Sequence, residues 1–210
     1  MQSVAFERPD IDEVNLELTA YLQGIALRGW AKTLPNRSDQ ELRHQFNPDK
    51  HEHLARVQKI YKEFAELNGL VLARTTAPDG SSDPIAFALA RDDVSGNAAE
   101  RLYKRHFRPE KVYAILRHVC VDAPYQQAGV GKQLVGEALR PFRDEQVPTA
   151  YIFEENLVAL KAFQRLGFEK SSSPQEPKIL DDYFGTENPA VAQYRFAAGS
   201  VEAVRNLAAA

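Results

Sequence analysis

The sequence has little of what marks secreted, membrane-spanning or nucleic-acid-binding proteins. Cys120 is the only cysteine, so no intramolecular disulfide can form, and a reducing compartment is favoured over secretion. No run approaches the roughly 18 apolar residues of a membrane span, and residues 1–10 contain no apolar core of signal-peptide length. A net charge of −3 gives no basis for nucleic-acid binding. We therefore expect a protein of the cytoplasm, or of cytoplasm and nucleus, without a membrane or nucleic-acid partner.

What is present is the composition of an ordinary globular protein whose pattern changes along the chain. The 210 residues are 44% apolar and 26% charged, which suits one well-cored domain. The first third shows apolar residues at helical spacing. Short apolar runs at 70–74 and 85–91 then flank a stretch of turn formers and predict an antiparallel hairpin. We predict a single domain over residues 1–198 and a C-terminal tail or weak helix over 199–210.

The stretch from Val121 to Gly131 joins a strand pattern to a helix pattern. The preceding run, 112–121, is nearly continuous apolar sequence, typical of a strand covered on both faces. After the stretch, apolar residues recur at helical spacing from Leu134 to Phe142. Glycines let the backbone approach a ligand, and the N–H groups at a helix start attract anions. We predict that this loop binds a pyrophosphate.

Two common nucleotide motifs do not fit the loop. A dinucleotide fingerprint needs a third glycine three residues after Gly131, where Leu134 stands. A Walker A loop needs Ser or Thr at the position of Gln133. The remaining pattern, Gln126-x-x-Gly129-x-Gly131, resembles the acyl-CoA pyrophosphate loop of the GNAT-type N-acetyltransferase superfamily.

The resemblance extends to both sides of the loop, over about residues 113–170. Upstream, the family usually has an apolar strand ending in Val and a turn with Pro and Tyr, supplied here by Val119, Val121, Pro124 and Tyr125. Downstream, it has a strand, an Asn before a helix, and a Leu-Gly-Phe ending. Here these are residues 149–153, Asn156 and residues 166–168.

This resemblance implies an α/β (α+β) fold of the GNAT type. The expected architecture is a central mixed, mostly antiparallel sheet of about six or seven strands flanked by helices. A V-shaped splay is expected between strands four and five. Because the family usually joins strands three and four more directly, residues 92–111 are interpreted as an insertion between them.

The resemblance also implies which residues bind the cofactor. The main chain of Val119 and Val121 is expected to pair with the pantetheine arm, and an N–H at Val119 or Cys120 to polarise the thioester. Backbone amides of the loop are expected to take the pyrophosphate, while the Lys132 side chain either adds charge or is solvated. The loop residues concerned are Gln126, Gln127, Ala128, Gly129, Val130, Gly131 and Lys132. Asn156 is expected to cap the following helix and is a candidate contact to the pantetheine.

The resemblance does not define which side chains would act as acid and base in an acetyl transfer. Many family members have Tyr where this chain has Phe163, which fills the same space but cannot donate a proton. His118 has a suitable intrinsic pKa, yet it can equally be a satisfied buried histidine. Strand alternation sends it and Arg117 to opposite faces unless a bulge intervenes. The other candidate catalytic residues are Tyr151, Glu154 and Tyr194.

The function that the resemblance implies is that of an acyltransferase. Acetyl-CoA would be the acyl donor, and a primary amine would attack it directly in a ternary complex. Aromatic residues that could line a pocket, Trp30, Tyr151, Tyr183 and Tyr194, favour a small-molecule amine. Two alternatives stay open: an acyl-CoA-binding or regulatory protein with little catalytic activity, and a protein N-terminal or lysine acetyltransferase. We expect no metal site, and a monomer or homodimer.

Overall fold

The computed structural model describes residues 4–34, 36–76, 82–92, 113–153, 155–170 and 193–210. Its elements in chain order are β1 Val4–Glu7, α1 Leu16–Thr33, α2 Asp39–Gln45, α3 His51–Glu66, β2 Leu70–Thr76, β3 Ser82–Asp92, β4 Tyr113–Val121, the 3₁₀ turn η1 Ala123–Tyr125, α5 Val130–Leu139, β5 Val147–Phe153, α6 Leu157–Arg165, β6 Glu169–Lys170, β7 Gln193–Ala197 and α8 Val201–Ala209. The predicted insertion at 92–111 lies, apart from the last residue of β3, outside the described residues.

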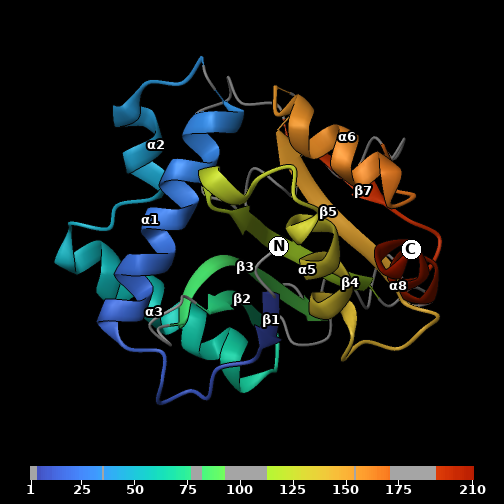
Figure 1. Ribbon diagram of the computed structural model, residues 1–210, viewed down its shortest axis with the longest axis horizontal. Helices are drawn as coiled ribbons and strands as arrows, with labels where there is room; N and C mark the ends of the chain where they lie inside the picture. Colours follow the sequence, from blue (N-terminus) through green and yellow to red (C-terminus); the bar gives the residue numbers. More distant parts are fainter. Residues whose placement is uncertain (1–3, 35, 77–81, 93–112, 154, 171–192) are drawn as a thin grey trace, which may run out of the picture.

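A mixed sheet of seven strands organises the described part of the chain, in the order β1-β2-β3-β4-β5-β7-β6 (Figure 1). Neighbouring strands are antiparallel except β4 and β5, which are parallel. Helix α5 connects these two strands, because parallel neighbours need a crossover connection. The predicted mixed, mostly antiparallel sheet with flanking helices is confirmed, as is the hairpin of β2 and β3.

Alternation along the strands divides the interior into two hydrophobic cores, one on each face of the sheet. Ala86 and Ala88 of β3 belong to the core formed with α5, α6 and α8. Phe87 and Leu89 of the same strand belong to the core formed with α1, α2 and α3. Successive residues from Ala86 to Ala90 therefore contact opposite cores, which explains why the middle of β3 is wholly apolar.

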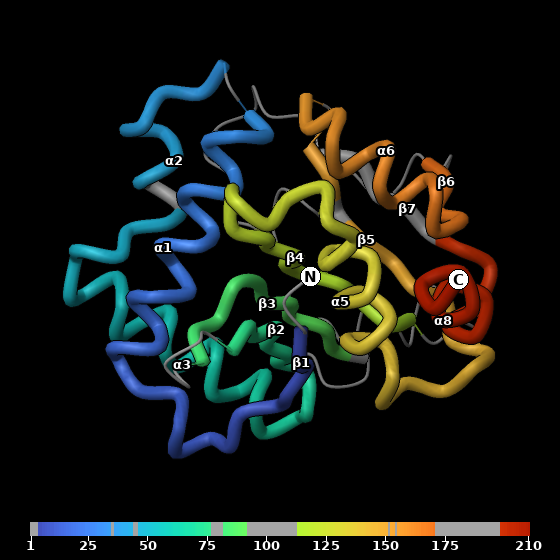
Figure 2. Tube along the Cα trace, viewed as in Figure 1, coloured from blue at the N-terminus to red at the C-terminus, as the bar shows by residue number. Residues whose placement is uncertain are grey.

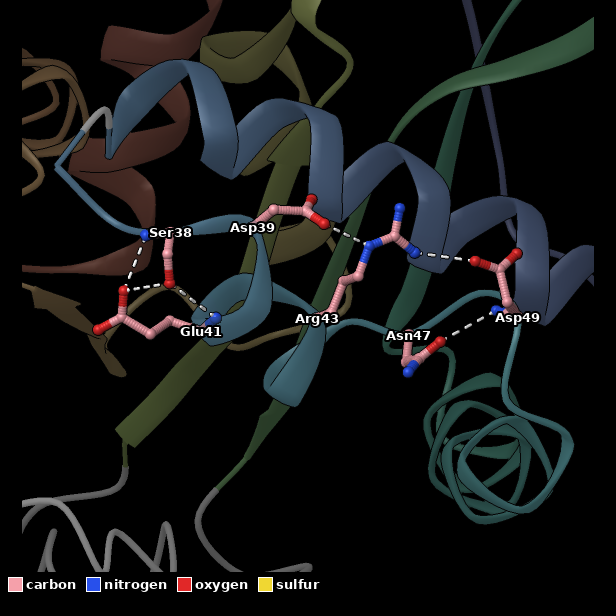
Figure 3. A network of polar contacts seen from close by, with 6 residues as sticks. All are labelled: Ser38, Asp39, Glu41, Arg43, Asn47 and Asp49. Carbon is pink, nitrogen blue, oxygen red and sulfur yellow. Dashed lines mark hydrogen bonds and ion pairs between the residues drawn. The ribbon is translucent and has the colours of Figure 1, made fainter.

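A polar network holds the short helix α2 at the surface (Figure 3). The Ser38 hydroxyl accepts from the backbone N–H of Glu41, and the Glu41 carboxylate accepts from the backbone N–H of Ser38, which makes a capping box. Arg43 donates to Asp39 at 2.7 Å and to Asp49 at 2.8 Å, and so ties α2 to the chain leading into α3. Because a helix of seven residues has little stability of its own, these contacts stabilise it.

The end of the chain forms a helix, one of the two alternatives that the sequence left open. Residues 201–209 form α8, and the hydroxyl of Ser200 accepts from a backbone N–H in its first turn. Val201, Val204 and Ala208 are buried, and α8 lies beside α5 (Figure 2). A helix of nine residues has little stability of its own. Packing onto α5 stabilises the helix.

Candidate active site

The two parallel strands at the centre of the sheet pair over only part of their length. Tyr113–Leu116 of β4 pairs with Val147–Ala150 of β5, and no further pair joins these strands within the described residues. Residues 118–121 of β4 stay paired with β3, and their other edge, on the side of β5, pairs with no strand in the part of the chain that the structure describes. This is the predicted splay. An open edge can accept an extended ligand as an added strand.

The loop that follows β4 contains backbone conformations that favour glycine. Gly129, the N-cap residue of α5, has a φ of 81°, and Gln127 has a φ of 72°. A Cβ added to Gly129 would meet no atom within 4 Å, so the space beside the loop is open. Ala128 and Lys132 are exposed, whereas Val130, the first residue of α5, is buried against the sheet. Because the first N–H groups of a helix lack intrahelical partners, this loop suits an anion.

Gln126 and Gly131 attach the loop to β4 and α1. The Gln126 side-chain amide donates to the carbonyl oxygens of Val121 in β4 and Gly29 in α1, each at 3.1 Å. A Cβ added to Gly131 would lie 3.4 Å from Cγ2 of Val121. The predicted cofactor-binding residue Gln126 therefore uses its side chain to hold the loop, and its backbone remains the candidate ligand contact.

Cys120 packs in the core beneath α1. Its side chain is buried, and burial raises the pKa of the Cys120 thiol to about 12. A thiol with such a pKa is not a nucleophile at neutral pH, so only its backbone N–H remains a candidate for contact with a thioester. Val119 and Val121 are half-buried and pack against the opposite core, beneath α5.

Two predicted cofactor-binding residues, at the start of α6 and within it, also have structural roles. Asn156 is the N-cap residue, and its Oδ1 accepts from the backbone N–H of Ala159 at 3.0 Å, which confirms the expected cap. Phe163 is 8% exposed and packs edge-on against Phe168, with ring centroids 5.0 Å apart. Because a phenyl ring has no transferable proton, this position supplies no acid.

A β-bulge decides which face of the sheet His118 occupies. Between Leu116 and His118, β4 contains one residue more than the facing stretch of β3, namely Arg117. The extra residue reverses the alternation, so Leu116 faces α5 whereas the His118 ring lies 5.9 Å from the ring of Phe46, which follows α2. The predicted possibility of a bulge is therefore realised.

The surroundings of His118 keep its ring neutral. Its Nδ1 is buried and has no hydrogen-bond partner in the described part of the chain. Burial lowers the pKa of His118 to about 4, and the charge of Arg117 acts in the same direction. A neutral imidazole with that pKa is a weak base, but it can accept a hydrogen bond.

The other three candidate catalytic residues are placed only in part. Tyr151 lies in β5 opposite Arg195, and Tyr194 lies in β7 opposite Ile152. Glu154 lies outside the described residues. The backbone therefore brings Tyr151 and Tyr194 to neighbouring strands, just beyond the point where β5 and β4 cease to pair.

The structure adds an aromatic cluster that no motif reveals. The Trp30 ring of α1 lies 4.7 Å from the Phe46 ring and 5.1 Å from the Phe153 ring at the end of β5. Phe46 in turn contacts His118. The cluster therefore spans from β4 to β5 on the α1 side of the splay. The sequence analysis named Trp30 and His118 as candidates. It did not name Phe46 and Phe153, because an aromatic residue in a sequence is usually part of the core.

An ion pair covers part of this cluster. Arg37, between α1 and α2, contacts the Glu155 carboxylate at 2.5 Å, and its side chain is only 13% exposed. Its Cζ lies 5.0 Å from the centroid of the Phe153 ring, close enough for a cation–π interaction. Glu155 follows β5, so the pair joins the α1–α2 connection to the start of α6.

Elsewhere, the described residues offer little further site chemistry. A shallow hollow of about 270 Å³ opens at the start of α1, lined in part by Glu13, Glu17, Tyr21 and Arg74, and none of its lining residues is a predicted site residue. Within the described ranges, no three His, Cys, Asp or Glu side chains gather as a metal site requires. No helix in those ranges combines the length and the apolarity needed to cross a membrane.

Comparisons with known proteins agree with this geometry. A model of the Acetyltransferase (GNAT) family matches residues 40–168. A chain of the NatC complex, solved with a Gag peptide and CoA, is similar with a TM-score of 0.57 at 16% identity, covering 95% of this chain and 99% of that chain. No curated protein matched the sequence.

Two further solved structures share the fold. PaiA N-acetyltransferase from Thermoplasma acidophilum, solved with coenzyme A, has a TM-score of 0.53 at 14% identity and covers 94% of this chain and 99% of that chain. NAA60 from Arabidopsis thaliana, solved with a bisubstrate analogue, has a TM-score of 0.52 at 12% identity and covers 93% of this chain and 97% of that chain. At such identities these structures support the fold and not the acceptor.

Proposed function

Since the chain belongs to the GNAT acetyltransferase family, a class of acyltransferases, we propose that it transfers the acetyl group of acetyl-CoA to the primary amine of a small molecule. The observation that carries this proposal is the open edge of β4 at residues 118–121, followed directly by the exposed glycine loop. A CoA thioester needs an edge for its extended arm and a loop for its pyrophosphate. The chain offers them consecutively.

The donor side is the part of the site that would hold acetyl-CoA, and there backbone groups do most of the binding. The main-chain N–H groups of residues 126–132 take the pyrophosphate, and the exposed Lys132 adds positive charge. The pantetheine arm lies along the edge at Val119 and Val121, with the N–H of Val119 or Cys120 directed at the thioester oxygen. Phe163 and Asn156 support this side from α6 and its cap.

On the acceptor side, His118 orients the amine. In the tautomer with its proton on Nε2, the unpartnered Nδ1 accepts a hydrogen bond from a neutral amine. A pKa of about 4 makes His118 too weak a base to deprotonate an ammonium group, so the amine reacts in its neutral form. Its nitrogen bonds to the acetyl carbon, the C–S bond breaks, and the proton lost by the nitrogen ends on the thiol sulfur.

The route of that proton involves other side chains. Phe163 cannot carry it, so Tyr151, Glu154 and Tyr194 are the candidates to pass it on. An alkyl thiol titrates near about 8.5, so the leaving group needs only modest help. The activity therefore does not depend on restoring an acid at Phe163.

The acceptor side favours a small molecule over a protein chain. Trp30, Phe46 and Phe153 pack together beside it, and the ion pair of Arg37 with Glu155 covers one side. An extended peptide needs an open groove, whereas a compact amine fits beside a covered aromatic wall.

A catalytically weak acyl-CoA-binding protein is the second candidate. The absence of an acid at Phe163 and the low pKa of His118 favour it, because neither side chain transfers protons readily near neutral pH. The donor side would be the same, and only turnover separates the two candidates.

Thiol release from acetyl-CoA tests these alternatives. It is measured with a panel of small primary amines and with a panel of peptides that carry a free N-terminus or a lysine. We expect release with at least one small amine. Release with peptides alone would contradict the small-molecule acceptor. CoA binding by calorimetry, without release in either panel, would favour the binding protein.

A further inference from the structure

The C-terminal half of α1 contacts the connection that leads from β4 into the glycine loop. The Arg28 guanidinium donates to both carboxylate oxygens of Asp122, from Nε at 2.9 Å and from Nη2 at 2.7 Å. Lys32, one turn later, donates from Nζ to the carbonyl oxygen of Ala123 at 2.8 Å. One face of α1 therefore holds the first two residues after β4.

The backbone of α1 also lies directly against the end of β4. A Cβ added to Gly29 would lie 2.6 Å from the carbonyl oxygen of Val121, closer than side chains tolerate. The carbonyl oxygen of Gly29 accepts from the Gln126 side chain. Gly24 leaves room for the Arg28 guanidinium, since an added Cβ would lie 3.1 Å from its Nη1. Small residues thus let the helix and the loop meet closely.

The Asp122 carboxylate accepts three hydrogen bonds, two from Arg28 and one from a backbone N–H. Its side chain is only 12% exposed, and its Oδ1 also accepts from the backbone N–H of Ala123 at 2.8 Å, where it caps η1. Arg28 is 51% exposed and so reaches Asp122 from the solvent side. A bidentate guanidinium restricts a carboxylate to one orientation. Arg28 therefore helps to set the direction in which the chain leaves β4.

We propose that Arg28, acting through Asp122, is a positioning residue for the loop at residues 126–132 and thereby strengthens binding of the CoA pyrophosphate. This inference rests on the proposed function, which assigns the pyrophosphate to that loop. Gln127 and Gly129 hold left-handed conformations, and such conformations persist where the surrounding structure holds them. Arg28 holds the upstream end of the loop, and α5 holds the downstream end. Without Arg28, the ligand must order the loop as it binds.

Calorimetry with CoA on the full chain tests this role. Arg28→Gln removes the charge and the bidentate geometry, whereas Arg28→Lys keeps the charge alone. Arg74→Gln is the matched control, because Arg74 also pairs with a carboxylate, Glu7, and donates to a carbonyl, that of Ser82, but these contacts join β1, β2 and β3. We expect Arg28→Gln to weaken CoA binding about 5- to 20-fold. Arg28→Lys should be intermediate, and Arg74→Gln should bind as the parent does.

Dephospho-CoA lacks the 3′-phosphate. It therefore separates positioning of the loop from a direct contact between Arg28 and that phosphate. Positioning acts on the pyrophosphate, so Arg28→Gln should weaken CoA and dephospho-CoA by the same factor. A loss confined to CoA would assign Arg28 to the 3′-phosphate and overturn the proposal. In an Asp122→Asn background, Arg28→Gln should cause no further loss, and full additivity would contradict the route through Asp122.

Amide hydrogen exchange without ligand reports on the loop itself. Arg28→Gln should speed exchange at residues 123–132 and leave β2 and β3 unchanged. An Arg28→Gln chain that binds CoA as tightly as the parent would overturn the positioning role and leave the proposed function intact. A parent chain that binds neither CoA nor dephospho-CoA would instead overturn the proposed function.

Discussion

The two faces of the sheet are built from different side chains. Most strand positions under α5 and α8 carry alanine, at Ala73, Ala86, Ala88, Ala90, Ala114 and Ala150. The strand positions under α1, α2 and α3 carry larger side chains, among them Leu70, Leu72, Phe87, Leu89 and Phe153. Small residues let backbones approach closely. A Cβ added to Gly136 in α5 would lie 2.8 Å from the Cβ of Ala208 in α8.

Because of this difference, the two faces should contact ligands through different groups. On the α5 face, small residues hold backbone close to backbone, and the proposed donor contacts are backbone groups. On the α1 face, the proposed acceptor contacts are side chains such as Trp30 and His118, held by their neighbours. Substitutions on the first face should therefore act through conformation and charge at the loop. Substitutions on the second should act through individual side-chain chemistry.

The largest effect is expected for Gly129→Asp. The new side chain projects into open space, and Asp adopts the left-handed conformation more readily than most residues, so the fold should survive with some backbone strain. Its carboxylate would lie beside the pyrophosphate, and like charges about 4 Å apart repel by about 4 kcal/mol at an effective dielectric of 20. CoA affinity in calorimetry should fall about 100-fold or more.

Gly129→Asn is the control for Gly129→Asp. Asn has the size of Asp and tolerates the left-handed conformation, but carries no charge. It should lose much less affinity. Equal losses for the two variants would show that backbone strain, and not charge, disfavours the ligand, and unchanged affinity for Gly129→Asp would remove the pyrophosphate from this loop.

An intermediate effect is expected for His118→Gln, on the opposite face. The folded chain lowers the pKa of His118 from 6.5 to about 4, so between these values the unfolded state binds more protons. The contribution of His118 to stability is therefore present above pH 6.5 and is lost as the pH falls toward 4. Across that window, the difference in unfolding free energy between parent and variant should change by at most about 3 kcal/mol.

Urea unfolding at a series of pH values measures this difference. Because all other groups are common to the two chains, the variant corrects for their titration. A constant difference from pH 4 to 6.5 would show that His118 titrates alike in the folded and unfolded chains, and would return it to the list of general bases.

The smallest effect is expected for Asn156→Ala. Loss of the cap of α6 should cost about 0.5–2 kcal/mol of unfolding free energy, measured by denaturant titration. Ser200→Ala, which removes the cap of α8, is the matched control for capping without a predicted ligand contact. If Asn156→Ala leaves stability unchanged but raises the KM for acetyl-CoA, contact with the pantetheine is its main role.

The backbone turn at Gly129 and the helix cap at Asn156 were predictable because their determinants are local. Gly129 suits the left-handed backbone at its own position, and Asn156 caps the helix that begins at the next residue. The acceptor side depends on contacts between distant segments, such as Trp30 with Phe153. The roles of Tyr151, Glu154 and Tyr194 stay predictions, because a strand position does not specify proton transfer.

By itself, the sequence predicted the fold class and the splayed central strands, through its resemblance to the GNAT family, whereas the binding of the donor by the loop at residues 126–132 stays a prediction. Only the tertiary structure decided that His118 faces α1, because one extra residue in β4 reverses the alternation. Only packing made residues 201–209 a stable helix. Arg28 and Asp122 lie 94 residues apart in the chain, and Arg37 and Glu155 lie 118 apart. No local pattern records such pairs, because their geometry follows from the packing of α1 across the ends of β4 and β5.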